Sequence, residues 1–456
     1  MNFKIKLGIV SLFFFVIILI AGSLTIWESL SCGLMLYCFL SFIDDLGKKI
    51  VIMDYAVLMM VGTCLVMPVI FYHYYPKTFA LARLWNKYMP ISSDDYFDFA
   101  FPAVAAMVIG VRFTIRKLRV NNNPVVYMNN VREYLKTRPN LGMSLIAVGV
   151  LSGFMDFLAP SSLAQVLNFT EHLTYVGVFY VIYSPSKHKR FIVPGVIVLM
   201  LGQSLVTGMF GEMVNMAACS LPLILLGNKK INFQRKLLFT SLGIFIVLLI
   251  QSVKGEYRQK TWTNNSGADP VYFAQLVGEK LGDVGATLDP ESLFFLSVRM
   301  NQGWLVAVTM KRVPERYPFA NGETIFNSVA ASIVPRFLWP DKPTAGGAEN
   351  LKRFWGYSMV GYSMNIGPLG EAYANFDVVG GAIYMLFYGL FFNFMLSGLL
   401  KASEKRPTIV LWLPFLFYYA ISVETDALTT MGSLIKGVFF TWLIFQFYRI
   451  AFRLDL

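Results

Sequence analysis

Long apolar runs alternate with polar segments along most of the chain. Most runs are close to the ~20 residues that a helix needs to cross a bilayer. They do not alternate with a period of two, which argues against strands. The pattern predicts an all-α, polytopic integral membrane protein with about twelve transmembrane helices. The runs lie at 5–23, 27–43, 52–72, 99–115, 141–159, 166–183, 191–209, 212–227, 237–252, 378–400, 408–423 and 433–449.

One interruption, residues 253–376, is much longer than the usual connection between helices. Four tryptophans and many other aromatic residues lie in it, which favours an ordered segment. The predicted organisation is therefore residues 1–252 with spans one to nine, residues 253–376 as a large extracytoplasmic loop with amphipathic helices, and residues 377–456 with spans ten to twelve.

Two stretches outside the spans have the pattern of helices at the membrane surface. Residues 79–88 form one, in an outer loop that covers 73–98. Residues 291–312 form the other, with Phe294, Val298 and Leu305 on one face. Arg299 near its middle would be costly inside a bilayer, so we expect this helix to lie against the membrane.

Composition excludes two classes of protein. Hydrophobic residues make up 56% of the chain and charged residues 14%, whereas about 25% of a typical soluble domain is charged. A soluble protein could not bury so much apolar surface, and a disordered chain would be richer in charge and poorer in aromatics.

The net charge of +12 is explained by topology rather than by nucleic acid. Basic residues concentrate in alternate connections, which marks these as cytoplasmic by the positive-inside rule. Both termini are then cytoplasmic, and no nucleic-acid partner is needed. The four cysteines lie in apolar runs without metal-type spacing, and we expect no metal site and no cofactor.

The densest polar cluster lies late in the long loop. Pro335, Pro340 and Pro343 argue against a continuous helix there. Arg336 and Lys342 would then sit on a stiff turn near the lipid headgroups, where they suit a phosphate or diphosphate. The alternative is that Arg336 pairs with loop carboxylates and braces the fold.

The residues of this cluster, together with a segment that follows them, resemble a known protein family. Pro-Arg-Phe-Leu-Trp-Pro-Asp-Lys-Pro at 335–343, followed by Gly-Pro-Leu-Gly-Glu-Ala-Tyr-Ala-Asn-Phe at 367–376, resembles the Wzy-type O-antigen and exopolysaccharide repeat-unit polymerases. The resemblance implies an enzyme in the bacterial cytoplasmic (inner) membrane, a glycosyltransferase that acts on its outer face. The growing glycan leaves its polyprenyl diphosphate and joins the next lipid-linked oligosaccharide. Expected partners are that oligosaccharide, membrane lipid, a chain-length regulator and a flippase.

Residue roles follow from this chemistry. The leaving diphosphate needs cations, and the acceptor hydroxyl needs a carboxylate base. We predict catalytic roles for Glu371, Arg336 and Arg299, although Glu371 could instead cap a helix or pair with Arg336. Predicted substrate-binding residues are Lys342, Lys352, Arg353, Trp339, Tyr373 and Asn375. Other candidates on the outer side are the carboxylates Glu171, Glu212, Glu424 and Asp426, together with His172 and Lys436.

Two other functions fit the same sequence. A lipid-linked oligosaccharide flippase would move substrate without forming a glycosidic bond, although transporters typically show repeated halves and charged midplane sites. An O-antigen ligase-like enzyme would transfer finished glycan to a different acceptor, and only its product would distinguish it from a polymerase.

Overall fold

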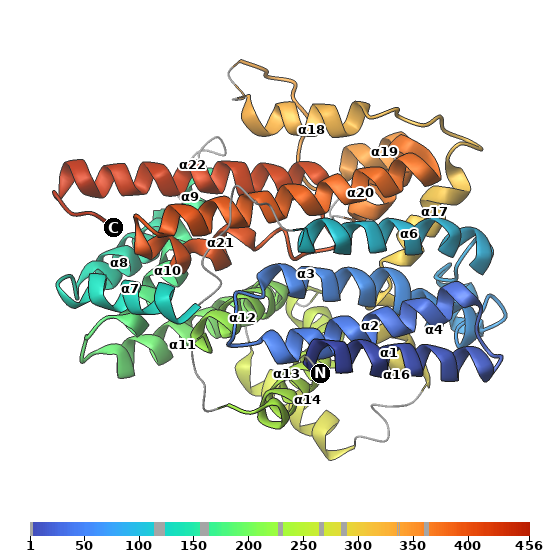
Figure 1. The fold of residues 1–456 in the computed structure, drawn as a ribbon, viewed down its shortest axis with the longest axis horizontal. Coiled ribbons are helices and arrows are strands. Elements are labelled where there is room, and N and C mark those ends of the chain that lie inside the picture. The colour runs from blue at the N-terminus through green and yellow to red at the C-terminus, as the bar shows by residue number, and fades with distance from the viewer. Residues whose placement is uncertain are drawn as a thin grey trace.

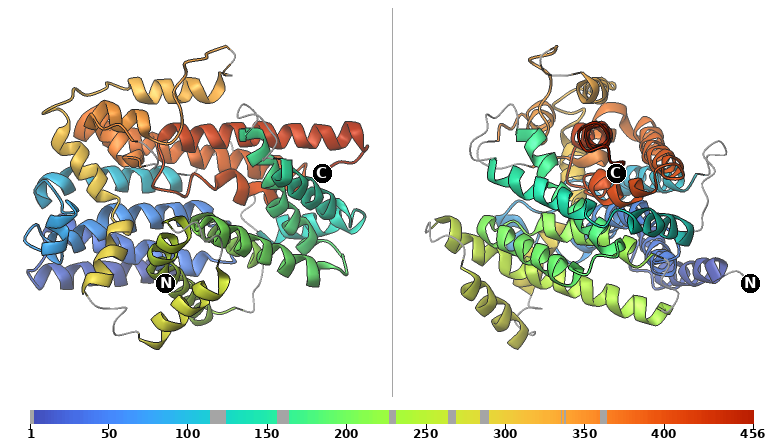
Figure 2. Two further views of the ribbon diagram at one scale, coloured as in Figure 1. Left: turned by 180° about the vertical axis from the view of Figure 1, so that it is seen from behind. Right: turned by 90° about the vertical axis from the view of Figure 1, so that its left-hand side faces the viewer.

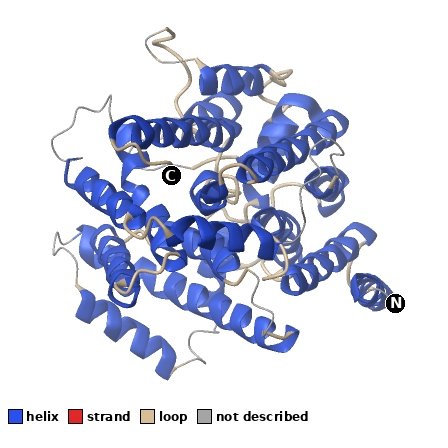
Figure 3. Cartoon of the chain, turned by 60° about the vertical axis from the view of Figure 1, so that its left-hand side comes forward, coloured by secondary structure: helices blue, strands red, loops and turns tan. Residues whose placement is uncertain are grey.

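The computed structural model describes residues 3–113, 124–155, 164–226, 231–263, 269–283, 290–334, 336, 338–359 and 364–456. Throughout these residues the named elements are all helical (Figure 3). The first half contains α1 (Phe3–Ile20), α2 (Ile26–Asp45), α3 (Ile52–Val61), α4 (Met67–His73), α5 (Ala80–Leu84), α6 (Ser93–Arg112), α7 (Pro124–Lys136), α8 (Leu141–Met155), α9 (Ala164–Glu171), α10 (Leu173–Tyr183), α11 (Lys189–Thr207) and α12 (Gly211–Ile224) (Figure 1).

The second half contains α13 (Phe233–Arg258), α14 (Pro270–Gly282), α16 (Pro290–Met300), α17 (Gly303–Arg312), α18 (Glu323–Ile333), α19 (Ala348–Trp355), α20 (Gly367–Ser403), α21 (Leu413–Phe417) and α22 (Ala427–Ala451). Short π-helical turns follow α3 at Gly62–Val66 and α13 at Gln259–Thr263. A 3₁₀ turn, Pro407–Trp412, precedes α21.

Every apolar run that the sequence pattern singled out contains helix in the described residues. Within that part of the chain, six stretches are long and apolar enough to cross a membrane. The all-α fold is thereby confirmed, and the protein has the helices that a membrane protein requires. The six stretches are Ile26–Asp45, Ile52–His73, Lys189–Thr207, Phe233–Thr261, Gly367–Ser403 and Ala427–Ala451.

Glycines let the central helices touch through their backbones. A Cβ atom on Gly110 of α6 would collide with the Leu386 carbonyl of α20, and one on Gly389 of α20 would collide with the Met107 carbonyl of α6. Such small residues are how helices approach closely in a membrane. Around this α6–α20 contact lies the core, with Val104 of α6 and Met385 of α20 fully buried.

A kink divides α20 into two parts. Asp377 has φ 60° and ψ −166°, values that no α-helix uses. The ten residues before it, 367–376, are the second half of the polar motif, and the apolar remainder runs on to Ser403. The motif is thus held at the start of a long apolar helix.

The loop at residues 253–376 is ordered into helices in its described parts, but the single helix predicted over 291–312 is wrong. The chain breaks between α16 and α17 because the Gln302 amide donates to the Thr63 carbonyl (3.1 Å) and the Trp304 amide donates to the Asn301 side chain (3.1 Å). The α17 part does not lie on the surface, because Leu305 and Val306 are buried in the core. At residues 79–88 the helix is shorter than predicted, at Ala80–Leu84.

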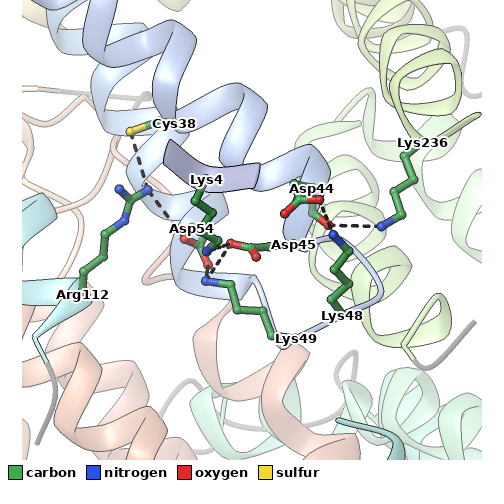
Figure 4. A network of polar contacts seen from close by, with 9 residues as sticks. All are labelled: Lys4, Cys38, Asp44, Asp45, Lys48, Lys49, Asp54, Arg112 and Lys236. Carbon is green, nitrogen blue, oxygen red and sulfur yellow. Dashed lines mark hydrogen bonds and ion pairs between the residues drawn. The ribbon is translucent and has the colours of Figure 1, made fainter. Parts of the chain in front are cut away.

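Charged side chains tie α1, α2, α3, α6 and α13 together at the ends that the charge pattern assigned to the cytoplasm (Figure 4). Asp45 accepts from Lys4 and Lys49, each at 2.9 Å. Asp54 lies 3.4 Å from Lys49 and 3.9 Å from Arg112. Asp44 pairs with Lys48, and its carbonyl accepts from Lys236 at 3.2 Å. These carboxylates are engaged by lysine and arginine, so this network braces helices.

Candidate functional site

The turn after α18 carries the two cations of the polar motif. Arg336 is exposed and donates to the carbonyls of Pro340 (3.0 Å) and Lys342 (3.4 Å). The Lys342 ammonium donates to the carbonyls of Ala331 (2.9 Å) and Val334 (2.8 Å). Each cation therefore satisfies backbone groups of its own turn. Residues 335 and 337 of the motif lie outside the described residues.

A third cation comes from α22. The positive charges of Lys342 and Arg336 act on Lys436, and that of Arg336 acts on Lys342. Among the described residues, no carboxylate lies within ion-pair distance of Arg336 or Lys342. We call Arg336, Lys342 and Lys436 the α18–α22 cation group. A group of this charge suits an anion such as a phosphate.

Arg299 lies in a second group of charges. Its charge acts on Lys254 and Arg258 of α13 and on Glu424, which precedes α22. Burial raises the pKa of the Glu424 carboxyl above its ordinary value, and Lys254 and Arg299 oppose that rise. The Glu424 side chain still contacts solvent. Such burial makes a carboxylate hold a proton more readily than a glutamate in water does.

Glu371 connects three helices and is fully buried, at 0% exposure. It accepts from the Ala427 amide at the start of α22 (2.8 Å) and from the Asn350 side chain of α19 (3.2 Å). Its neighbour Asp426 accepts from the amides of Gly347 (3.1 Å) and Thr429 (2.7 Å). The capping alternative that the sequence left open for Glu371 fits these contacts, while the Arg336 side chain bonds within its own turn.

Three predicted binding residues are engaged by the protein itself. Tyr373 packs edge-on against Phe99, with ring centroids 5.2 Å apart. Asn375 is 1% exposed and donates to Thr324 (2.7 Å). Arg353 forms a two-bond pair with Glu323, at 3.0 and 2.7 Å.

The remaining two predicted binding residues reach the surface. Lys352 is exposed on α19, and Trp339 is half-buried in the turn after α18. These two, unlike Tyr373 and Asn375, can meet a ligand without movement of the surrounding helices.

Sequence reasoning missed Lys254 and Arg258 as neighbours of Arg299. Their signal was available, because both follow directly on the apolar run at 237–252. The structure continues that helix to Arg258 and brings α16 against it. It also puts His172 in a small pocket of about 10 Å³ that is lined by Phe415, Tyr418 and Ser433 among others, roughly the space of one water molecule. The Glu212 side chain lies outside the described part.

Comparison with known proteins gives a family but no activity. A family model described as a domain of unknown function (DUF8712) matches residues 96–404. The match begins in α6, includes the long loop and ends after α20, so it contains Arg299, Arg336 and Glu371. No curated protein and no solved structure matches the chain.

Proposed function

The chain belongs to the DUF8712 family, and we propose from its site that it is a glycosyltransferase that joins polyprenyl-diphosphate-linked oligosaccharide repeat units into a cell-surface polysaccharide. The reaction takes place on the outer face of a bacterial cytoplasmic membrane. This proposal combines the resemblance of residues 335–343 and 367–376 to Wzy-type polymerases with the charges around them.

The proposed topology has twelve spans and both termini in the cytoplasm. Helix in each of the twelve apolar runs supports it, as does the lysine-rich network that joins Lys4, Lys48 and Lys49 at one end. In this topology residues 253–376 and the starts of α20 and α22 face the outside. The α18–α22 cation group is then on the outer side.

The single observation that carries the proposal is the α18–α22 cation group. Arg336 and Lys342 have no carboxylate partner among the described residues, and Lys436 adds a third positive charge beside them. A lipid diphosphate carries the negative charge that this group requires. In the reaction the cations stabilise the diphosphate as it leaves, which is where charge develops.

The reaction itself breaks one bond and forms another. The bond between the anomeric carbon of the donor glycan and the diphosphate oxygen breaks, and the acceptor hydroxyl oxygen bonds to that carbon. The hydroxyl proton passes to a carboxylate, and polyprenyl diphosphate departs with the bonding electrons. We assign the base to Glu424, which contacts solvent and lies in the charge group of Arg299 and Lys254.

We assign Glu371 a positioning role. Asn350 and Ala427 would have to move away before its carboxylate could reach an acceptor. Its contacts instead fix the start of α22, three residues after Glu424, relative to α19 and α20. Trp339 and Lys352 are the accessible candidates for sugar or phosphate contact.

The test is the Arg336→Ala variant in the native host. We expect membrane levels like those of the unaltered protein, loss of long polysaccharide and accumulation of single repeat units. The matched control is Arg316→Ala, an exposed arginine of the same loop, which should leave polymer length unchanged. Normal polymer from Arg336→Ala would contradict the assigned role.

Product analysis separates this proposal from the other two functions. A flippase would move lipid-linked oligosaccharide across the membrane and leave its length unchanged. A ligase would attach glycan to a different lipid core, so no product would contain two joined repeat units on polyprenyl diphosphate.

A further inference from the structure

Helix α18 has its polar and apolar faces reversed relative to a helix at a water-exposed surface. Its buried side is made of small residues, Ser328, Ala331 and Ser332. The opposite side of the helix, which faces away from the protein, carries Phe326 at 80% exposure, Val329 at 40% and Ile333 at 66%. The i, i+3, i+7 spacing puts these three on one stripe. Such a stripe is disfavoured in water and expected in lipid.

The helix runs side by side with a membrane-spanning candidate. Gly432 of α22 lies against Ser332, whose hydroxyl would be 2.9 Å from a Cβ atom at that glycine. Four residues further along the chain from each of these two, Arg336, in the turn after α18, lies near Lys436 of α22. The two helices therefore run in the same direction. Figure 2 shows both of them end-on in its right-hand view, with α18 at the periphery.

This register gives the depth of α18. It has 11 residues, which corresponds to ~16 Å, about half of the hydrocarbon core. Its start is fixed beside the polar part of α20, because the Ala320 amide donates to the Ala374 carbonyl (3.0 Å) and Asn375 donates to Thr324 (2.7 Å). Its end lies near Lys436, the tenth residue of α22. The helix thus descends along α22 from the outer end.

Side chains pair four described backbone carbonyls at the end of α18 and in the turn after it. A helix leaves its last carbonyls without partners, and in a bilayer each such group must be paired internally. The Lys342 ammonium donates hydrogen bonds to the carbonyls of Ala331 and Val334 at the end of α18. The Arg336 guanidinium donates hydrogen bonds to the carbonyls of Pro340 and Lys342. The hydroxyls of Ser328 and Ser332 donate to carbonyls within α18, both at 2.7 Å.

We propose that α18 and the turn after it form a re-entrant hairpin in the outer leaflet, with the Phe326–Val329–Ile333 stripe covered by lipid acyl chains. The occupant is lipid because α22, against which α18 packs, exposes Phe439 and Trp442 in the same way. Leu338, at 68% exposure, continues the apolar surface into the turn.

The hairpin also changes how a ligand reaches the cations. Charges at this depth are costly unless an anion accompanies them. A lipid phosphate could approach Arg336 sideways from the bilayer, without passing through the outer aqueous phase. That consequence rests on the proposed function, whereas the position of α18 in the outer leaflet rests on the proposed topology.

The test measures depth and uses no activity. Nitroxide spin labels are attached through cysteine at positions 326 and 333 in the full-length protein in liposomes. The background carries Cys32→Ala, because Cys38, Cys64 and Cys219 are buried. Labels at Phe439 of α22 and at Glu315, which is exposed in the loop after α17, are the lipid and water controls. Collisions with oxygen and with a water-soluble nickel chelate are then compared.

We expect the ratio of oxygen to nickel collisions at 326 and 333 to match that at 439 and to exceed that at 315 several-fold. Nickel collisions as frequent as at 315 would place the stripe in water and overturn the proposal. Low rates with both reagents would mean that a second copy or another protein covers the stripe, which also overturns it. A label at Val329 of the same stripe repeats the comparison if a label at 326 or 333 perturbs the helix.

Discussion

Ser332 of α18 lies against Gly432 of α22, so closely that a Cβ atom at Gly432 would come within 2.9 Å of the Ser332 hydroxyl. This contact aligns the two helices and brings Arg336 and Lys342 near Lys436. The α18–α22 cation group therefore depends on Gly432, whose lack of a side chain lets α18 pack closely against α22.

Gly432→Val should separate α18 from α22. Overpacking of a close contact costs about 1–3 kcal/mol, so we expect a lower unfolding temperature in detergent together with loss of polymer. Gly398→Val is the matched control, because no heavy atom lies within 4 Å of a Cβ there. Equal unfolding temperatures for the two variants would show that α18 does not rest on Gly432.

Lys342→Met should release the end of α18. The substitution keeps the length of the side chain but removes the donor to Ala331 and Val334. Each carbonyl left unpaired away from water costs about 1–3 kcal/mol. We expect faster proteolysis in the turn and loss of polymer, measured by limited digestion of liposomes and by product length. Lys352→Met, at an exposed lysine, should change the digestion rate little.

How far the sequence predicted this fold can be seen from α18 itself. Length and hydropathy identified apolar runs that contain helix in the structure, because a continuous run carries its own signal. An 11-residue helix with Ser and Asn is too short and too polar for that criterion. The helical spacing of Phe326, Val329 and Ile333 is present in the sequence but was not used in the prediction, and which side of the helix faces protein depends on Gly432, about a hundred residues away.

The site was predictable to a similar extent. The motif identified Arg336, Lys342 and Glu371 as candidates, since cations and carboxylates in a Pro- and Gly-rich segment suit phosphate chemistry. It could not identify their partners. Ala427 meets Glu371 only through tertiary packing, and the break at Asn301 depends on the Thr63 carbonyl.

Glu371→Ala tests the positioning role. It leaves the Ala427 amide and the Asn350 side chain without their acceptor, at an expected cost of about 2–6 kcal/mol for two buried donors. We expect a large fall in unfolding temperature, measured with Glu404→Ala at an exposed glutamate after α20 as the control. An inactive Glu371→Ala protein of unchanged stability would instead favour a direct catalytic role.

The pH profile tests Glu424. A base must be deprotonated, so its raised pKa should put the acid limb of activity above the range of an ordinary glutamate. Arg299 and Lys254 lower that pKa, so Arg299→Ala or Lys254→Met should move the limb to higher pH, while Glu424→Gln should abolish activity without loss of stability. An acid limb that stays in place in both cation variants would exclude Glu424 as the titrating group.

The most direct measurement of the central claim is reconstitution of the purified protein in liposomes with a polyprenyl-diphosphate-linked oligosaccharide as the only substrate. The lipid-linked products are then separated by mass. The account predicts a ladder spaced by one repeat unit, with one polyprenyl diphosphate released for each bond formed, and no ladder with Arg336→Ala. Substrate that crosses the bilayer or stays in place without any gain in length, at a protein level that binds it, would contradict the account.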